Sequence, residues 1–154
     1  MAEDLRKLGD PGSADFHVEA YPFYLLNRTA SRYNAAIETE LRSIGIDIPT
    51  WRVLMVLGEE SPRPVAKVGR AAVIKLSTLM RIAERMARAG LITTERDEMD
   101  RRVTQLALTT EGEEKLMAAR AVTAPFYKKL IRGFSERDFA RLLQLMNRLY
   151  DNLA

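Results

Sequence analysis

Basic side chains are concentrated in one part of the chain, between Arg63 and Arg88. This segment holds seven basic residues and one acid, Glu84, so its net charge of +6 (seven minus one) exceeds the +3 of the whole chain. Arginine donates in pairs to phosphate oxygens and to the O6 and N7 atoms of guanine. A segment of this charge attracts polyanions, and we interpret it as a surface for double-stranded DNA.

Most of these basic residues fall on a predicted helix, residues 76–89. Its apolar residues recur at helical spacing and are expected to point inward; they are Leu76, Leu79, Ala83 and Met86. Hydroxyl groups at a helix start can donate to a phosphate. The predicted DNA-binding side chains of this segment are Lys75, Ser77, Thr78, Arg81, Arg85 and Arg88. The alternative is a solvated charged face on which one arginine pairs with Glu84.

A second charged cluster lies between two β-prone runs, residues 91–96 and 103–108. The pattern predicts a hairpin whose tip carries Arg101 and Arg102 beside two acids, Asp97 and Asp100. In one interpretation an Asp–Arg pair braces the tip while the other arginine enters the DNA minor groove, whose potential favours cations. The alternative is an ordinary charged β-turn. The two aspartates are not an acid/base pair, because the neighbouring arginines keep both ionised.

Residues for catalysis or metal binding are lacking in the sequence. The chain has one histidine, His17, and no cysteine, and it has no glycine-rich phosphate loop and no nucleophile motif. We therefore expect no enzyme activity, no cofactor and no metal site. A pocket for a small aromatic or carboxylate ligand is a weaker prediction; its candidate residues are His17, Tyr21, Tyr24, Arg28 and Trp51. Core and dimer packing is the alternative role for these side chains.

Helices must position both charged clusters. Spacing and cap signals predict helices at 17–44, from Pro49 onward, at 65–72, at 113–132 and from an N-cap at Ser135 to the end of the chain. Pro125 predicts a kink or a break in its helix. A short helix, a turn, a cationic helix and a hairpin follow one another in this order, and that order is typical of a winged helix-turn-helix.

The composition of the chain limits the classes of protein to which it can belong. The chain has 154 residues, of which 47% are hydrophobic and 29% charged, so it can form a packed core. The absence of cysteine excludes disulfides. No run approaches the ~20 apolar residues of a membrane span, and the first residues lack the apolar core of a signal peptide. We expect a cytoplasmic protein without a membrane partner.

Long helices with apolar stripes flank the central unit in sequence and need a partner surface. A symmetric dimer, in which the terminal helices of two chains interdigitate, would supply this surface. The alternative is that the terminal helices close over the central domain of their own chain. We predict a flexible tail at 1–15, a helical dimerisation region at 16–45 and 113–154, and a winged helix-turn-helix DNA-binding domain at 46–112. The predicted fold class is mainly α with a small β-hairpin wing.

The best motifs of the chain are Asp97-Glu98-Met99-Asp100-Arg101-Arg102 and Leu108-Thr109-Thr110-Glu111-Gly112. With these the chain resembles the MarR family of transcriptional regulators over nearly its whole length. The resemblance implies a homodimer, a recognition helix at 76–89, and minor-groove contact by Arg101 or Arg102. It also implies release of DNA by a small, often phenolic, ligand. Val73 stands in the turn where the family often has glycine, which allows an altered turn geometry; valine can serve there if its φ stays negative.

Two main hypotheses follow. The first is a DNA-binding transcriptional regulator, a repressor, that binds a near-palindromic operator as a homodimer and is released by a small, aromatic or phenolic ligand. The second is a dimeric small-molecule-binding or protein-interaction module without specific DNA binding. The arginines at 81–88 and 101–102 favour the first.

Overall fold

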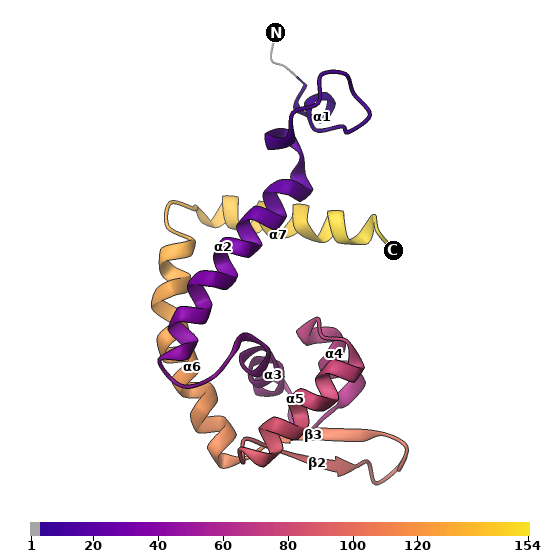
Figure 1. The fold of residues 1–154 in the computed structure, drawn as a ribbon, viewed down its shortest axis with the longest axis vertical. Coiled ribbons are helices and arrows are strands. Elements are labelled where there is room, and N and C mark those ends of the chain that lie inside the picture. Colours follow the sequence, from indigo (N-terminus) through magenta and orange to yellow (C-terminus); the bar gives the residue numbers. More distant parts are fainter. Residues whose placement is uncertain (1–3) are drawn as a thin grey trace.

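The computed structural model describes residues 4–154 and is mainly helical, with one small sheet (Figure 1). The helical elements are α1 (Leu5–Leu8), the 3-10 helix η1 (Val18–Ala20), α2 (Pro22–Arg42), α3 (Ile48–Glu59), α4 (Val65–Ala72), α5 (Leu76–Arg88), α6 (Thr110–Leu130) and α7 (Glu136–Asp151). The strands are β1 (Arg63–Pro64), β2 (Ile92–Arg96) and β3 (Thr104–Leu108). The fold class predicted from the sequence, a winged helix-turn-helix with flanking N- and C-terminal helices, is confirmed.

The wing sheet has one strand more than the predicted hairpin. The antiparallel strand order is β1-β3-β2. The hairpin prediction includes β2 and β3 but not β1, which pairs with β3 and places Arg63 opposite Leu106. Strand β1 has only two residues, so it shows no alternation from which a strand could be predicted. Its pairing fixes the wing to the connection between α3 and α4.

Two groups of buried residues hold the helices together. The larger joins α3, α4, α5 and β3 through fully buried side chains such as Leu54, Val68, Leu79 and Leu106. The smaller joins α2 to α6 through Ile37, Leu41 and Ala119. Helices α3, α4 and α5 and the sheet therefore share one core, and α6 links that core to the α2 side of the molecule (Figure 1).

Side chains cap the starts of α3 and α7, and of these two caps the one at Ser135 confirms a prediction from the sequence. Asp47 caps α3 by accepting from the Thr50 amide at 2.9 Å. Ser135 caps α7 in a reciprocal box with Asp138, whose amide donates to the Ser135 Oγ at 3.1 Å. These caps satisfy backbone donors that a helix start leaves without intrahelical partners.

Pro125 does not split its helix, because α6 runs without interruption from Thr110 to Leu130. Both Pro125 and Ala121 are exposed, so water can satisfy the carbonyl that loses its donor.

The turn before α5 differs from the sequence analysis at two residues. Val73 has a φ of +55° and a ψ of +49°, which is the left-handed region, so the condition of a negative φ is not met. Leu76 is 53% exposed and does not belong to the buried face of α5, where Ile82 is buried instead. Leu76 therefore lies on the outer side of the first turn of α5, whereas Leu79 in the same turn is fully buried.

The two ends of the chain differ from the compact centre. Residues 1–3 of the predicted flexible tail lie outside the described residues; residues 4–15 contain α1, and Leu8 is buried. The flexibility of this segment stays a prediction. Helix α7 has no buried residue, and it lies with α2 at the end of the molecule opposite the wing (Figure 1). Among residues 4–154, no helix combines the length and apolar character that crossing a membrane requires.

Candidate nucleic-acid interface

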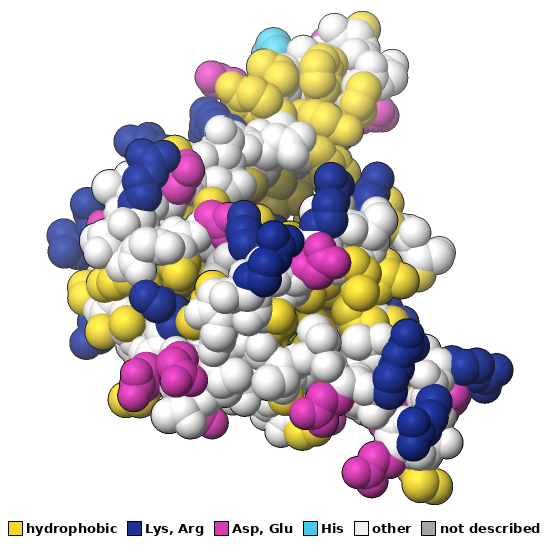
Figure 2. Space-filling model, turned by 60° about the horizontal axis from the view of Figure 1, so that its bottom comes forward, with side chains coloured by type: hydrophobic (Ala, Val, Ile, Leu, Met, Phe, Trp, Pro, Cys, Tyr) yellow, Lys and Arg dark blue, Asp and Glu magenta, His cyan; other side chains and the backbone are white. Residues whose placement is uncertain are grey.

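Helix α5 is buried on one side and charged on the other. Leu79, Ala83 and Met86 are at most 1% exposed and pack into the main core. The predicted DNA-binding side chains of this segment are all exposed: Lys75, Ser77, Thr78, Arg81, Arg85 and Arg88. Figure 2 shows basic side chains over the centre of this face and at the protruding corner formed by the wing, with acidic side chains beside them.

Only some of these cations are free of intramolecular partners. Arg88 lies 3.7 Å from Glu84, which confirms the predicted pairing of one arginine with that acid. Arg85 donates to Asp47 at 2.6 Å and to the Thr50 hydroxyl at 3.1 Å. Within residues 4–154, Lys75 and Arg81 form no ion pair. The unpaired charge is therefore concentrated at the N-terminal half of α5.

Arg85 attaches the C-terminal half of α5 to the start of α3. Partial burial alone would raise the pKa of Asp47, but hydrogen bonds from Thr50 and the charge of Arg85 hold that pKa below its ordinary value. The carboxylate is thus ionised at neutral pH and serves both as helix cap and as ion-pair partner. This pair holds Arg85 against α3, and the DNA contact of Arg85 stays a prediction. The sequence analysis predicted neither the Asp47 cap nor the pair, whose two side chains are 38 residues apart.

The turn between α4 and α5 sets the other end of the helix. The Ile74 amide donates to the Gly69 carbonyl at 2.9 Å. A Cβ on Gly69 would lie 3.1 Å from the Ile74 carbonyl oxygen and 3.3 Å from Leu79 Cδ2, so a small residue is needed for this close approach. Together with the left-handed Val73, these contacts fix the start of α5 against α4.

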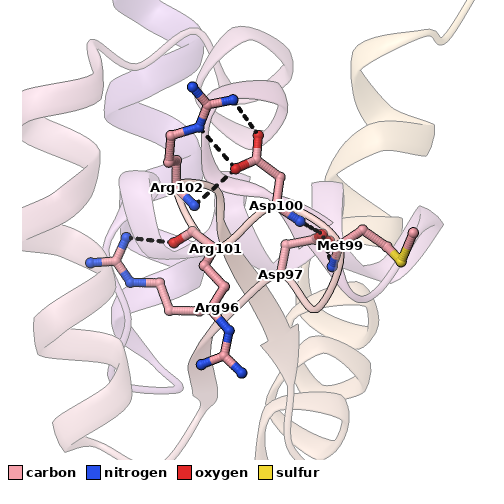
Figure 3. Close-up of polar contacts among 6 residues, drawn as sticks. All are labelled: Arg96, Asp97, Met99, Asp100, Arg101 and Arg102. Atoms are coloured by element: carbon pink, nitrogen blue, oxygen red, sulfur yellow. Dashed lines mark hydrogen bonds and ion pairs between the residues drawn. The ribbon is translucent and has the colours of Figure 1, made fainter.

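Asp97 organises the wing tip. Its Oδ1 accepts from the amides of Met99 and Asp100, each at 2.9 Å (Figure 3). Its Oδ2 accepts from Gln105 Nε2 at 2.6 Å. The Asp100 amide first, and then Gln105 and the Met99 amide, lower the pKa of Asp97. The tip is consequently a closed turn around an ionised carboxylate, which supports the bracing role predicted for Asp97.

The two wing arginines have different partners. Arg102 donates to both oxygens of Asp100, at 3.0 and 3.1 Å, and the side chain of Arg102 is still 92% exposed. This contact lowers the pKa of Asp100, so the pair is ionised and acid/base chemistry at the tip is excluded. The Arg101 side chain leaves the tip in another direction (Figure 3), while its carbonyl accepts from Arg96 at 3.3 Å. The sequence analysis missed Arg96 and Gln105 as supports of the tip.

A second set of contacts holds the base of the wing. Thr109 donates to the Gly90 carbonyl at 2.6 Å and accepts from the Gly112 amide at 3.0 Å. A Cβ on Gly112 would lie only 2.0 Å from the Leu91 carbonyl oxygen, so no side chain fits there. The spacing of the Leu-Thr-x-x-Gly motif is therefore explained: it fixes the root of the wing to the start of α6.

The predicted ligand residues are not brought together within one chain. Trp51 lines a cavity of about 410 Å³ between α2, α3 and α6, together with Tyr33, Phe126 and other residues. His17 instead borders a cavity formed by the N-terminal segment, and Arg28 lies over the ring of Tyr24 at 5.5 Å from its centroid. Trp51 Nε1 is buried and has no hydrogen-bond partner. The sequence analysis missed Tyr33 and Phe126 because their α-helical spacing equally predicts core packing.

The cationic helix and the arginine-tipped wing on one winged helix-turn-helix core define a DNA-binding protein. A model of the MarR family matches residues 44–103. The HTH-type transcriptional repressor IacR of Pseudomonas putida is 34% identical over 144 residues, which cover 94% of this chain and 86% of the relative.

Solved structures of other transcriptional regulators have a similar fold. A MarR-family transcriptional regulator from Silicibacter pomeroyi has a TM-score of 0.79 at 25% identity, covering 90% of this chain and 93% of that one. The PcaV regulator from Streptomyces coelicolor, solved with its natural ligand, has a TM-score of 0.77 at 22% identity and covers 92% of this chain and 99% of that one. The chain belongs to the MarR family of DNA-binding transcriptional regulators, which are not enzymes.

Proposed function

We propose that the protein is a homodimeric repressor that binds a near-palindromic operator and releases it when a small aromatic ligand binds. The exposed cations Lys75 and Arg81 at the start of α5, on the same winged helix-turn-helix core as an arginine-tipped wing, are the observation on which this proposal rests. The relative named as a repressor supports the direction of the regulation.

The dimer is proposed from the exposed apolar surface of α7. Large side chains along this helix are 38% to 76% exposed; they are Leu142, Leu143, Leu145, Met146 and Tyr150. A monomer rarely leaves an apolar patch of this kind in water. A second copy related by a twofold axis would cover it with the same residues, and would present two α5 helices to successive major grooves about one DNA turn apart.

We assign the major groove to the first half of α5 and the minor groove to the wing. Arg81 and Ser77 face outward there, in the part of a recognition helix that contacts base edges. Arg102 is the proposed minor-groove residue because Asp100 already holds its exposed guanidinium, so less rotamer entropy is lost on binding. Arg101, which points elsewhere, would contact a backbone phosphate.

The cavity beside Trp51 is the proposed effector site. Its volume of about 410 Å³ suits a small ligand, and its lining is apolar and aromatic apart from a few polar groups. The unpartnered Trp51 Nε1 and the rim residue Arg120 offer donors to a carboxylate or phenol. Burial raises the pKa of Tyr33, so its hydroxyl stays a neutral hydrogen-bonding group at pH 7. Trp51 adjoins Thr50, which contacts Arg85 of α5, so a shift of α3 on ligand binding would reach the recognition helix.

The first test selects bound fragments from the source genome and measures operator affinity at several salt concentrations. We expect a near-palindromic site whose affinity falls steeply with salt. Arg81→Ala should weaken binding by about tenfold or more, as expected for loss of a base or phosphate contact in each half-site. Arg132→Ala is the matched control, because this exposed arginine follows α6 at the end remote from the wing. A dimer that selects no duplex would contradict the proposal.

The second test concerns the ligand. Trp51 is the only tryptophan of the chain, so its fluorescence reports on the cavity directly. We expect benzoate or phenol to change this fluorescence and to lower operator affinity over the same concentration range. If neither probe nor any other small aromatic compound changes operator affinity, the ligand half of the proposal fails while the DNA-binding half stands.

A further inference from the structure

Two large apolar side chains lie exposed on the recognition helix. Leu76 is 53% exposed and Met80 is 40% exposed, whereas Leu79 between them is fully buried. They are four residues apart, so they share one flank of α5. Met80 also lines a groove between α5 and the wing strands, with Arg88 and Arg96. The first turns of α5 thus present an apolar strip beside Ser77 and Arg81.

The surroundings of this strip identify what covers it. On α5 the exposed side chains next to the strip are the hydroxyls of Ser77 and Thr78 and the cation Arg81, which match DNA rather than an apolar protein surface. The groove beside Met80 also holds two acids, Glu84 and Glu95, and two arginines, Arg88 and Arg96. The exposed apolar face of α7, which a second copy would cover, lies at the opposite end of the molecule (Figure 1). In the DNA major groove the C5-methyl group of thymine is the apolar group that a base edge presents.

We infer that Leu76 and Met80 are specificity-determining residues that pack against thymine C5-methyl groups in each operator half-site. The inference rests on the proposed DNA-binding function and adds to it a base preference that the charged residues cannot supply. Leu76, which is more exposed and lies in the first turn, is the main contact. Met80, whose unbranched side chain adapts to different shapes, contacts the neighbouring step on the wing side.

Deoxyuridine tests the inference, since it lacks the methyl group and keeps the hydrogen-bonding pattern of thymidine. Each thymine of the selected operator is replaced in turn, symmetrically in both half-sites. Loss of one buried methyl should weaken binding about fourfold, and loss of a symmetric pair about fifteenfold. With the unmodified protein, we expect this fifteenfold weakening at one or two thymine positions per half-site.

The variants assign the effect to side chains. Leu76→Ala should bind the thymine operator more weakly than the unmodified protein. At the thymine that Leu76 contacts, this variant should bind the thymine and uracil operators with nearly the same affinity. Met80→Ala should behave in the same way at the adjacent thymine. Both residues are largely exposed, so the variants should fold, and thermal unfolding verifies this. Met117→Ala is the matched control, because Met117 is a 69% exposed residue of α6, and it should keep the full uracil effect.

The outcomes separate this inference from the proposed function. If the protein binds its operator but no uracil substitution weakens binding, the inference is wrong and the DNA-binding function stands. The same holds if both alanine variants keep the full uracil effect. If the protein selects no duplex at all, the proposed function fails, and the inference fails with it.

Discussion

Replacing Val73 with glycine should stabilise the protein, although glycine is the smaller residue. Val73 has φ +55° and ψ +49°, close to the ideal left-handed conformation. An L-residue with a Cβ loses about 1–2 kcal/mol there, and a β-branched residue is a genuine outlier. The side chain is 83% exposed, so few contacts compensate for this cost.

The expected magnitude follows from two opposing terms. Val73→Gly removes about 1–2 kcal/mol of strain and adds about 0.5–1 kcal/mol of backbone entropy to the unfolded chain. The net gain is about 1 kcal/mol, which raises Tm by about 2–4 °C in a chain of this size. Val73→Asn should gain a similar amount, because asparagine tolerates the left-handed region. Val73→Ala should gain little, since alanine keeps the Cβ.

Urea and thermal unfolding measure these differences at one fixed protein concentration, because the stability of a dimer depends on concentration. Ala71→Gly is the matched control: it changes an exposed position of α4, where helical φ favours alanine, and should lose up to about 1 kcal/mol. A destabilising Val73→Gly, or equal gains for glycine and alanine, would refute the argument from strain. Operator affinity should be unchanged or higher in the stabilised variants.

Three further predictions concern the scaffold. Gly112→Ala should destabilise the protein by about 3 kcal/mol in urea unfolding, because the new Cβ would lie 2.0 Å from the Leu91 carbonyl oxygen and the wing root must shift; a neutral result would contradict the described packing. Asp47→Asn should lower stability by less than about 1 kcal/mol at pH 7, since its pair with Arg85 is half-exposed. The depressed pKa of Asp47 stabilises the fold above its ordinary value of 3.8, so this difference should vanish as the pH falls below 3.8 through the folded-state pKa; a gap that persists there would exclude the carboxylate as its cause. Leu143→Glu should dissociate the proposed dimer in sedimentation experiments, and an intact dimer would place the interface elsewhere.

A separate comparison decides between the wing arginines. Arg102→Ala should weaken operator binding more than Arg101→Ala, and Asp100→Asn should fall between them because it removes the brace but keeps the arginine. Gel-shift titration at one salt concentration measures all three variants. A larger loss for Arg101→Ala would mean that the Asp100–Arg102 pair only braces the tip, as one interpretation of the sequence proposed.

Local patterns in the sequence were sufficient to predict the main elements. Helical spacing identifies α5 because its buried side chains, Leu79, Ala83 and Met86, recur every three or four residues. The Ser135 cap can be predicted because its partner, Asp138, is three residues away. The charged wing tip can be predicted because the acids and arginines that contact one another lie within six residues, 97–102.

Features that join distant segments were decided by the tertiary structure. The pattern of charges assigns Arg85 to DNA, but the packing of α5 against α3 places it beside Asp47, 38 residues away. The spacing of apolar residues places Leu76 inside, but the packing of α5 against α4 across the left-handed Val73 buries Leu79 and leaves Leu76 of the same turn exposed. Periodicity describes neighbours along one helix; which faces are covered, and which cations remain free for DNA, depends on how separate helices pack.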